Sequence, residues 1–127
     1  MRKVVIETPA APKAIGPYSQ AIKANGFLFI SGQIPINPET GQMTAVDVVA
    51  QTRQSMDNLG AILNAEGLGF GDVVKTTIFL TNISDFAQVN DIYSEYFESA
   101  PPARSTVQVA ALPKGAKVEI EAIALSR

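Results

Sequence analysis

PPARSTVQVAALPKGAKVEIEAIA, residues 101–124, is the stretch that decides the fold of this chain. It contains two strand-like runs, Ser105–Ala110 and Lys117–Leu125, joined through Leu-Pro-Lys-Gly. In the second run, Glu119 and Glu121 alternate with apolar residues. Because side chains along a strand alternate between two faces, both carboxylates lie on one face. That face is either a solvent-exposed edge or the wall of a site.

Outward from this stretch, the chain alternates strand and helix signals. β-branched and alternating runs predict further strands at residues 3–7, 21–24, 27–31 and 72–80, and helical spacing predicts helices over 48–66 and from about 84 to 99. Asp47 and Gly67 are suited to the two ends of the first helix, and Asn25-Gly26 is a hairpin signal. This order predicts an α+β or α/β layer protein with two helices and about six strands.

Two helices cover only one face of such a sheet. If alternate apolar residues of the run Lys117–Leu125 meet the helices, the other face carries Glu119, Glu121, Ile123 and Leu125. A half-apolar face left open favours association. We therefore expect a closed homo-oligomer that buries this face, with ligand-binding clefts between the subunits.

Composition narrows the classes of function. The 127 residues carry no linker-like tract, which predicts a single domain over 1–127. The net charge is −2 without blocks of like charge, which argues against a nucleic-acid or membrane partner. The chain has no run of 18 apolar residues, and its first residues lack the apolar core of a signal peptide, so a cytoplasmic location is expected.

Missing residue types narrow the chemistry further. The chain has no cysteine and no histidine. This excludes disulfides, thiolate nucleophiles and Ser-His-Asp catalysis, and it argues against a metal site. Catalysis would have to use carboxylates, Lys, Arg, Tyr, hydroxyls, backbone amides or water.

Arg104 and Glu119 are the candidate catalytic residues. Arg104 stands at the entrance of a strand, where its planar two-pronged donor set is suited to hold a small carboxylate. The alternative is a salt bridge to a glutamate such as Glu98 or Glu121. Glu119 on a half-apolar face would be partly desolvated, which raises the pKa of a carboxyl toward a useful acid–base range. The alternative is an ion pair with Arg104 or a nearby lysine.

Three other residues leave two interpretations open. Tyr18 follows a Gly-Pro turn and is presented from a loop end, where it lines a site or simply packs. Gly32 directly follows a strand, which indicates close backbone approach or a bulge. Asn90 lies one residue off the apolar stripe of the second helix and is a boundary residue unless that edge faces a pocket.

Five segments resemble one known family: AIGPYSQA (14–21), SGQIP (31–35), VKTTIFL (74–80), DFAQVN (85–90) and PARSTVQVAALPKGAKVEIEAIA (102–124). They resemble the Rid family, also called the YjgF family, from about residue 5 onward. The last segment is long and specific. The resemblance implies a chorismate-mutase-like α+β fold that forms a homotrimer, with pockets between subunits.

The resemblance also implies roles for single residues. Arg104 would pair with the substrate carboxylate, and Glu119 would position or activate the hydrolytic water. The residues implied to line the pocket are Tyr18, Ser31, Gly32, Asn90 and Thr106. Thr106 stands where many members have cysteine. Because this position is expected to contact ligand through its backbone, activity should survive, whereas thiol-dependent regulation should be absent.

The activity implied is hydrolysis of 2-iminobutanoate and 2-iminopropanoate to 2-keto acids and ammonia, without a cofactor. Pyridoxal-phosphate-dependent threonine and serine dehydratases would supply these substrates. A keto-acid-binding regulatory protein of the same fold is the alternative. A ribonuclease or translation inhibitor is a third reading, against which the net charge and the lack of histidine argue.

One question of geometry stays open in the sequence. If residues 111–116 close a simple hairpin, Arg104 lies opposite about Ile123, roughly 13 Å along the strand from Glu119. The other reading is that the two strands are not neighbours.

Overall fold

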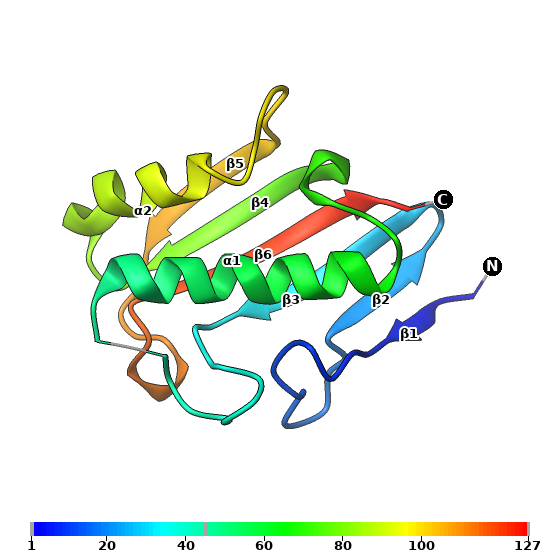
Figure 1. The fold of residues 1–127 in the computed structure, drawn as a ribbon, viewed down its shortest axis with the longest axis horizontal. Helices are drawn as coiled ribbons and strands as arrows, with labels where there is room; N and C mark the ends of the chain where they lie inside the picture. The colour runs from blue at the N-terminus through cyan, green and yellow to red at the C-terminus, as the bar shows by residue number, and fades with distance from the viewer. Residues whose placement is uncertain (1, 45, 127) are drawn as a thin grey trace.

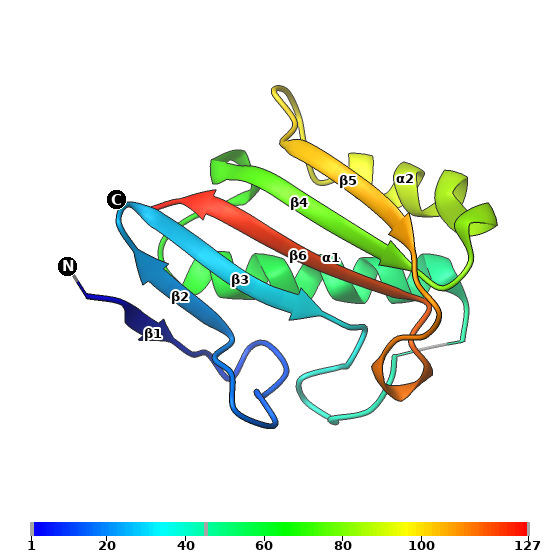
Figure 2. The ribbon, with the colours of Figure 1, turned by 180° about the vertical axis from the view of Figure 1, so that it is seen from behind.

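A computed structural model describes residues 2–44 and 46–126. Its strands are β1 (Val4–Ile6), β2 (Ala21–Ala24), β3 (Phe27–Gln33), β4 (Val73–Leu80), β5 (Ala103–Gln108) and β6 (Val118–Leu125), and its α-helices are α1 (Val48–Ala65) and α2 (Phe86–Ser94). The strands form one mixed sheet in the order β1-β2-β3-β6-β4-β5, in which only β4 and β5 run parallel. Both helices cover the same face (Figure 1), and the other face is open (Figure 2). The predicted α+β sheet with two helices on one face is confirmed.

The strands β5 and β6 are not neighbours, so the hairpin reading is wrong. α2 connects β4 to β5, as crossovers between parallel strands do, and β5 forms the outer edge of the sheet. The chain then returns, and β6 pairs with β4 and β3. Thr76 of β4 consequently has Arg104 as its register partner on one side and Ala122 on the other.

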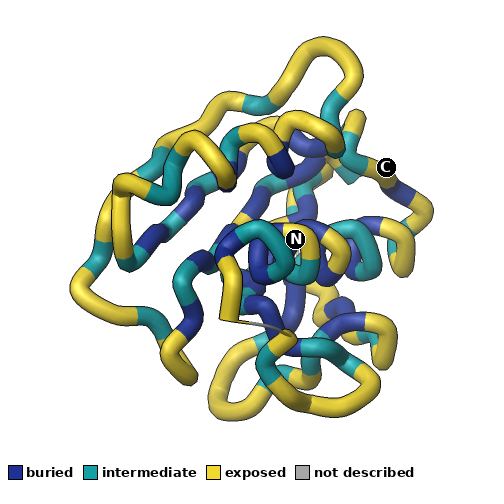
Figure 3. Tube along the Cα trace, turned by 60° about the vertical axis from the view of Figure 1, so that its left-hand side comes forward, coloured by how far each residue is buried: buried dark blue, intermediate teal, exposed yellow. Residues whose placement is uncertain are grey.

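The core lies between the helices and one face of the sheet. Along β6, the four alternate residues from Val118 to Ala124 are buried under the helices, as the alternation predicts. Their fully buried neighbours include Met56 and Ile62 of α1 and Val89 of α2. Figure 3 shows that the exposed positions lie mainly in the loops. Burial of this apolar face is the main stabilising contribution, at about 25 cal/mol per Å².

The ends of α1 follow the sequence signals. An Asp47 carboxylate oxygen accepts hydrogen bonds from the backbone of Val49 at 2.8 Å and Ala50 at 3.2 Å, and Gly67 follows the helix with a φ of +70°. α2 ends at Ser94, earlier than predicted, although the aromatic residues beyond it still pack against the core. Within the described ranges, no helix combines the length and apolar character needed to cross a membrane.

The open face carries an apolar row across the sheet. Register pairs join Val5 to Ile22, Ile22 to Phe29 and Phe29 to Ile123 across four strands. Phe29 is 43% exposed and Val5 is 51% exposed in the single chain. Exposed apolar surface of this kind typically marks an association site.

Candidate functional site

Four of the seven predicted site residues lie together at one cavity. This cavity, of about 750 Å³, opens beside the end of β3 and the start of β6. Tyr18, Ser31, Gly32 and Glu119 line it, and we call them the Glu119 group. Segments far apart in the sequence therefore converge here, as the resemblance implied.

Gly32 and Glu119 are in close contact. A Cβ atom added to Gly32 would lie 2.8 Å from Cδ of Glu119 and still closer to its Oε2 atom. A side chain at position 32 would therefore displace the carboxylate. The pairing of β3 with β6 also shifts register between Ile30 and Gln33. Both readings of Gly32, close approach and bulge, are thus correct.

Glu119 is partly buried on the open face of β6. Burial, together with a smaller contribution from the charge of Glu121, raises the pKa of the Glu119 carboxyl above its usual range. The two ion pairs in the described part of the chain join Lys23 to Glu66 and Arg53 to Glu95, so Glu119 takes part in neither. A carboxyl in this environment binds and releases protons at a higher pH than an exposed one, which suits acid–base work.

Tyr18 is presented from the loop before β2, and 53% of its surface is exposed. Its backbone N–H donates to the carbonyl of Gly16 at 2.9 Å, and its hydroxyl oxygen accepts from the N–H of Ile15 at 3.4 Å. Tyr18 is therefore not fully buried, and the two interpretations, a site residue or a packing tyrosine at the base of a loop, both stay predictions. Its ring is available at the cavity wall.

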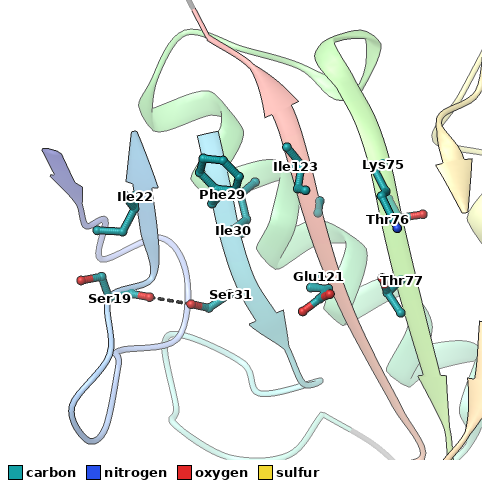
Figure 4. Close-up of a pocket in the computed structure, with 11 residues that line it drawn as sticks. Ser19, Ile22, Phe29, Ile30, Ser31, Lys75, Thr76, Thr77, Glu121 and Ile123 are labelled. Carbon is teal, nitrogen blue, oxygen red and sulfur yellow. Dashed lines mark hydrogen bonds between the residues drawn. The ribbon is translucent and has the colours of Figure 1, made fainter. Parts of the chain in front are cut away.

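Ser31 connects this loop to the sheet. Its hydroxyl donates to the carbonyl of Ser19 at 2.6 Å, drawn as the dashed line in Figure 4, and its N–H donates to the carbonyl of Gln20 at 2.9 Å. The hydroxyl proton is therefore used within the protein. Ser31 also borders a second hollow of about 430 Å³ on the open face, which Glu121 lines beside Thr77, its register partner on β4 (Figure 4).

Arg104 lies on the other side of the sheet, against α2. Its Nη1 donates to Oδ1 of Asn90 at 2.7 Å. The guanidinium carbon lies 5.3 Å from the ring centre of Phe86 and 5.1 Å from that of Tyr93, within cation–π range. The Tyr93 hydroxyl shares a 2.7 Å hydrogen bond with Thr76. Arg104 is in neither ion pair of the described residues, so the salt-bridge alternative is wrong.

Arg104, Asn90 and Thr106 form a second set, the Arg104 group. Arg104 and Thr106 alternate along β5 in register with Thr76 and Ile78, whose side chains are buried under the helices. The Thr106 hydroxyl oxygen is buried and has no hydrogen-bond partner in the described part of the chain.

The two groups lie far apart within one chain. Phe79 pairs with Glu119, whereas Arg104 pairs with Thr76, so the two residues are three register positions and two strands apart. At ordinary strand rise and spacing, that is roughly 10 Å in each direction. They also point to opposite faces of the sheet. One chain does not bring Arg104 and Glu119 together.

Sequence reasoning missed Phe86 and Tyr93 as partners of Arg104. With Asn90 they occupy positions i, i+4 and i+7 of α2, which is one helical face. In the sequence, Phe86 and Tyr93 belong to the apolar stripe of this helix, and Asn90 lies one residue off that stripe. Since an arginine beside a helical face can stack on aromatic rings, the same spacing was the available signal.

Comparisons with known proteins identify the family of this chain. The family model described as Endoribonuclease L-PSP matches residues 8–126. The chain belongs to this family, the Rid or YjgF family. The resemblance in the sequence is thereby confirmed.

Two curated relatives of this Rid protein cover nearly all of it. Protein DfrA of Myxococcus xanthus is 57% identical over 99% of this chain and 98% of its own length. The human 2-iminobutanoate/2-iminopropanoate deaminase is 51% identical over 95% of this chain and 88% of its own length. The relative named as a deaminase thus shares about half of the aligned residues with this Rid protein.

Two solved structures match the fold of the Rid protein closely. The Rid-family protein YyfA of Yersinia pestis is 59% identical with a TM-score of 0.95, covering 98% of this chain and 99% of that one. E. coli TdcF with bound serine is 47% identical with a TM-score of 0.93, covering 98% of this chain and 99% of that one. The sheet and helices described above are therefore the family fold.

Proposed function

We propose that this Rid protein hydrolyses 2-imino acids such as 2-iminobutanoate and 2-iminopropanoate to 2-keto acids and ammonia. The observation that carries the proposal is the Glu119 carboxyl held against Gly32 at a cavity wall, with a raised pKa. The deaminase names of relatives at about half identity support the substrate class. A small carboxylic acid also suits the free donors of a planar arginine.

We further propose that a complete site forms between two copies of the chain in a closed homotrimer. The Arg104 group lies on the helix side at the edge strand β5, and the Glu119 group lies on the open side. A second copy packed against the open apolar face would bring its own β5 edge next to Glu119. Three such contacts around an axis close the assembly and bury each open face once.

In this site, Arg104 binds the substrate carboxylate. Its Nη1 is occupied by Asn90, and the rings of Phe86 and Tyr93 fix the guanidinium plane, which leaves the remaining N–H donors for two carboxylate oxygens. Holding the acid end of the substrate sets the position of C2 relative to Glu119. Such positioning contributes several kcal/mol to a reaction that otherwise needs random encounter.

Glu119 acts on the water. Its carboxylate takes a proton from the water as the water oxygen bonds to C2. The C=N double bond becomes a C–N single bond, and the same carboxyl delivers that proton to the nitrogen, which leaves a carbinolamine and a free carboxylate. The carbinolamine then collapses, because its hydroxyl proton passes through the same carboxyl to the nitrogen. The C–N bond breaks, ammonia leaves, and C2 becomes the keto carbon. No electrons are exchanged with an external group, so the proposed chemistry uses no redox cofactor.

The experiment is a coupled assay. A pyridoxal-phosphate-dependent threonine dehydratase, added in excess, makes 2-iminobutanoate faster than water hydrolyses it, and keto-acid release is followed with and without this protein. We expect faster release with the wild type and no acceleration with Arg104→Ala. Equal rates with and without the wild type would overturn the proposed activity.

The same assay separates the other readings. Saturable binding of 2-ketobutyrate without faster release would indicate a keto-acid-binding regulatory protein, in line with the bound serine of the TdcF structure. RNA cleavage that persists in Arg104→Ala through repeated purification would instead support the ribonuclease reading that the family description carries.

A further inference from the structure

The loop before β2 carries Tyr18 but has little structure of its own. Its residues 8–18, TPAAPKAIGPY, include three prolines, which lack the N–H that backbone hydrogen bonding needs. Residues of this loop line both the 750 Å³ cavity and a neighbouring hollow of about 600 Å³. Something outside the loop must therefore hold it in place.

The side chain of Gln20 provides this support. Gln20 is only 5% exposed. Its Oε1 accepts from the N–H of Thr8 at 2.7 Å, and its Nε2 donates to the carbonyls of Thr8, Ala11 and Pro12 at 3.1, 3.3 and 2.8 Å. The one amide thus contacts four backbone groups of three loop residues, and its two N–H groups are shared among the three carbonyls. Buried backbone groups without such partners are costly, so the loop depends on this amide.

Gln20 also joins the loop to the sheet beside Glu119. Its own carbonyl accepts from the N–H of Ser31, the residue before Gly32. The Ser31 hydroxyl fixes the adjacent Ser19 carbonyl. Gln20 therefore binds β3 through its main chain, next to the cavity, and holds the first part of the loop, residues 8–12, through its side chain. Ala11, which is 3% exposed, also holds the loop, because its side chain is buried in the hydrophobic core.

We propose that Gln20 is a positioning residue that locks the 8–18 loop to the sheet and thereby sets Tyr18 at the wall of the cavity that Glu119 also lines. This inference rests on the proposed function for its kinetic part. Gln20 touches no reacting atom and acts through Tyr18. Its loss should weaken substrate binding more than it slows the chemical step, because a misplaced wall costs alignment and leaves the carboxyl of Glu119 unchanged.

The test compares two variants, Gln20→Met and Thr52→Val. Gln20→Met keeps the length and approximate volume of the side chain but removes all of its hydrogen bonds to the loop. Thr52 is also fully buried and donates to a backbone carbonyl, of Val48 at 2.7 Å, but it lies within α1 away from the cavity. We expect both variants to lower the melting temperature. Only Gln20→Met should raise the amide exchange rate of the 8–18 loop, by about tenfold or more. Unchanged exchange in this loop would overturn the lock.

Kinetics test the link to Tyr18. We expect Gln20→Met to raise KM about tenfold with a smaller change in kcat, and to have less than about a twofold effect when Tyr18→Ala is already present. An effect of equal size in both backgrounds would overturn the positioning role. If the wild type turns over no imine, the proposed function fails, and loop exchange alone decides the lock. If Gln20→Met does not fold, Gln20→Glu takes its place, because it keeps the acceptor for Thr8 and loses the donors at neutral pH.

Discussion

Glu119 lies at the wall of a cavity, where it contacts the backbone of Gly32 and is partly buried. Arg104, in contrast, lies on the outermost strand, is exposed to solvent, and stacks on the rings of Phe86 and Tyr93. The Glu119 group is built by close packing of backbone segments. The Arg104 group is built by stacking a flexible side chain on α2. The first holds a carboxyl with a raised pKa, and the second presents a positive charge at the exposed edge of the sheet.

Under the proposed function, neither group is a site by itself. The Glu119 group has acid–base capacity but lacks a nearby arginine, and the Arg104 group has an anion anchor but no carboxyl for the chemistry. Under the proposed function, each chain contributes one half to each of two different sites.

Removing the anion anchor should have the largest effect. Arg104→Ala should lower kcat/KM by roughly 100-fold or more, since a charge-assisted, two-pronged contact to the carboxylate is lost. The coupled dehydratase assay measures it. Arg53→Ala is the matched control, because Arg53 is an exposed arginine paired to Glu95 on the same side of the molecule, and it should retain full activity. Activity retained in Arg104→Ala would remove that residue from the site.

Mixing the two broken halves should restore activity. Arg104→Ala and Glu119→Gln, inactive alone, should recover about a quarter of the wild-type rate when co-expressed, because random assembly pairs an intact Arg104 with an intact Glu119 at one site in four. The measurement is the specific activity of the purified mixed oligomers. Mixing the separately purified, unexchanged proteins is the control. No recovery after verified subunit exchange would mean that each site belongs to one chain.

Gly32→Ala should reduce kcat/KM by about tenfold to 100-fold. Its Cβ occupies the place of the Glu119 carboxylate, and a displacement of about 1 Å is enough to cost this much. Gly69→Ala is the control, because a Cβ there meets nothing within 4 Å and its φ is negative. Equal activity of the two variants would show that the position of Glu119 is not critical.

Phe86→Leu should raise KM by about two- to tenfold with little change in kcat, because one of the two rings that orient Arg104 is lost. Phe70→Leu is the matched control. Phe70 packs on Tyr96 and Phe97 rather than on the guanidinium, so its loss should lower stability without raising KM. A KM unchanged by Phe86→Leu would show that Asn90 alone orients the arginine.

The smallest effect concerns stability and pH. The folded pKa of Glu119 is raised, so the folded chain holds this proton more tightly than the unfolded chain does. The stabilisation is complete below the unfolded pKa and is lost as pH rises through the folded pKa. Glu119→Gln should therefore melt roughly 1–4 °C above wild type at pH 7, with allowance for solvent screening, and the gap should close near pH 4. Thermal scans across this range check it, and a lower melting point at pH 7 would contradict the raised pKa.

Sequence reasoning succeeded where the controlling interactions are local. Asp47 and Gly67 end α1 through contacts within a few residues, and Asn25 with Gly26 forms the hairpin turn with φ values of 53° and 81°. The alternation in β6 assigned Glu119 to the open face correctly. The family resemblance grouped Tyr18, Ser31 and Gly32 at one pocket, and the structure places them at one cavity. Their spacing in the sequence alone did not indicate this grouping.

Sequence reasoning failed where the structure depends on pairing between segments that are distant in the sequence. Whether Arg104 points to the helices or to the open face depends on its register with β4, and no local pattern encodes that register. The strand order that inserts β4 between β5 and β6 is likewise a long-range choice. Tyr96 and Phe97 continue the spacing of α2 beyond its end at Ser94, because ring contacts with Phe70 hold them against the core without a helix.

The edge position of β5 has a consequence for how this protein would behave in a cell. If an Arg104 on that edge works only against another chain, the number of working sites obeys mass action and does not simply count chains. At low abundance the protein would be present but idle, and its output would rise more steeply than its concentration until assembly is complete. Dose, as well as chemistry, would then be set by the outermost strand of the sheet.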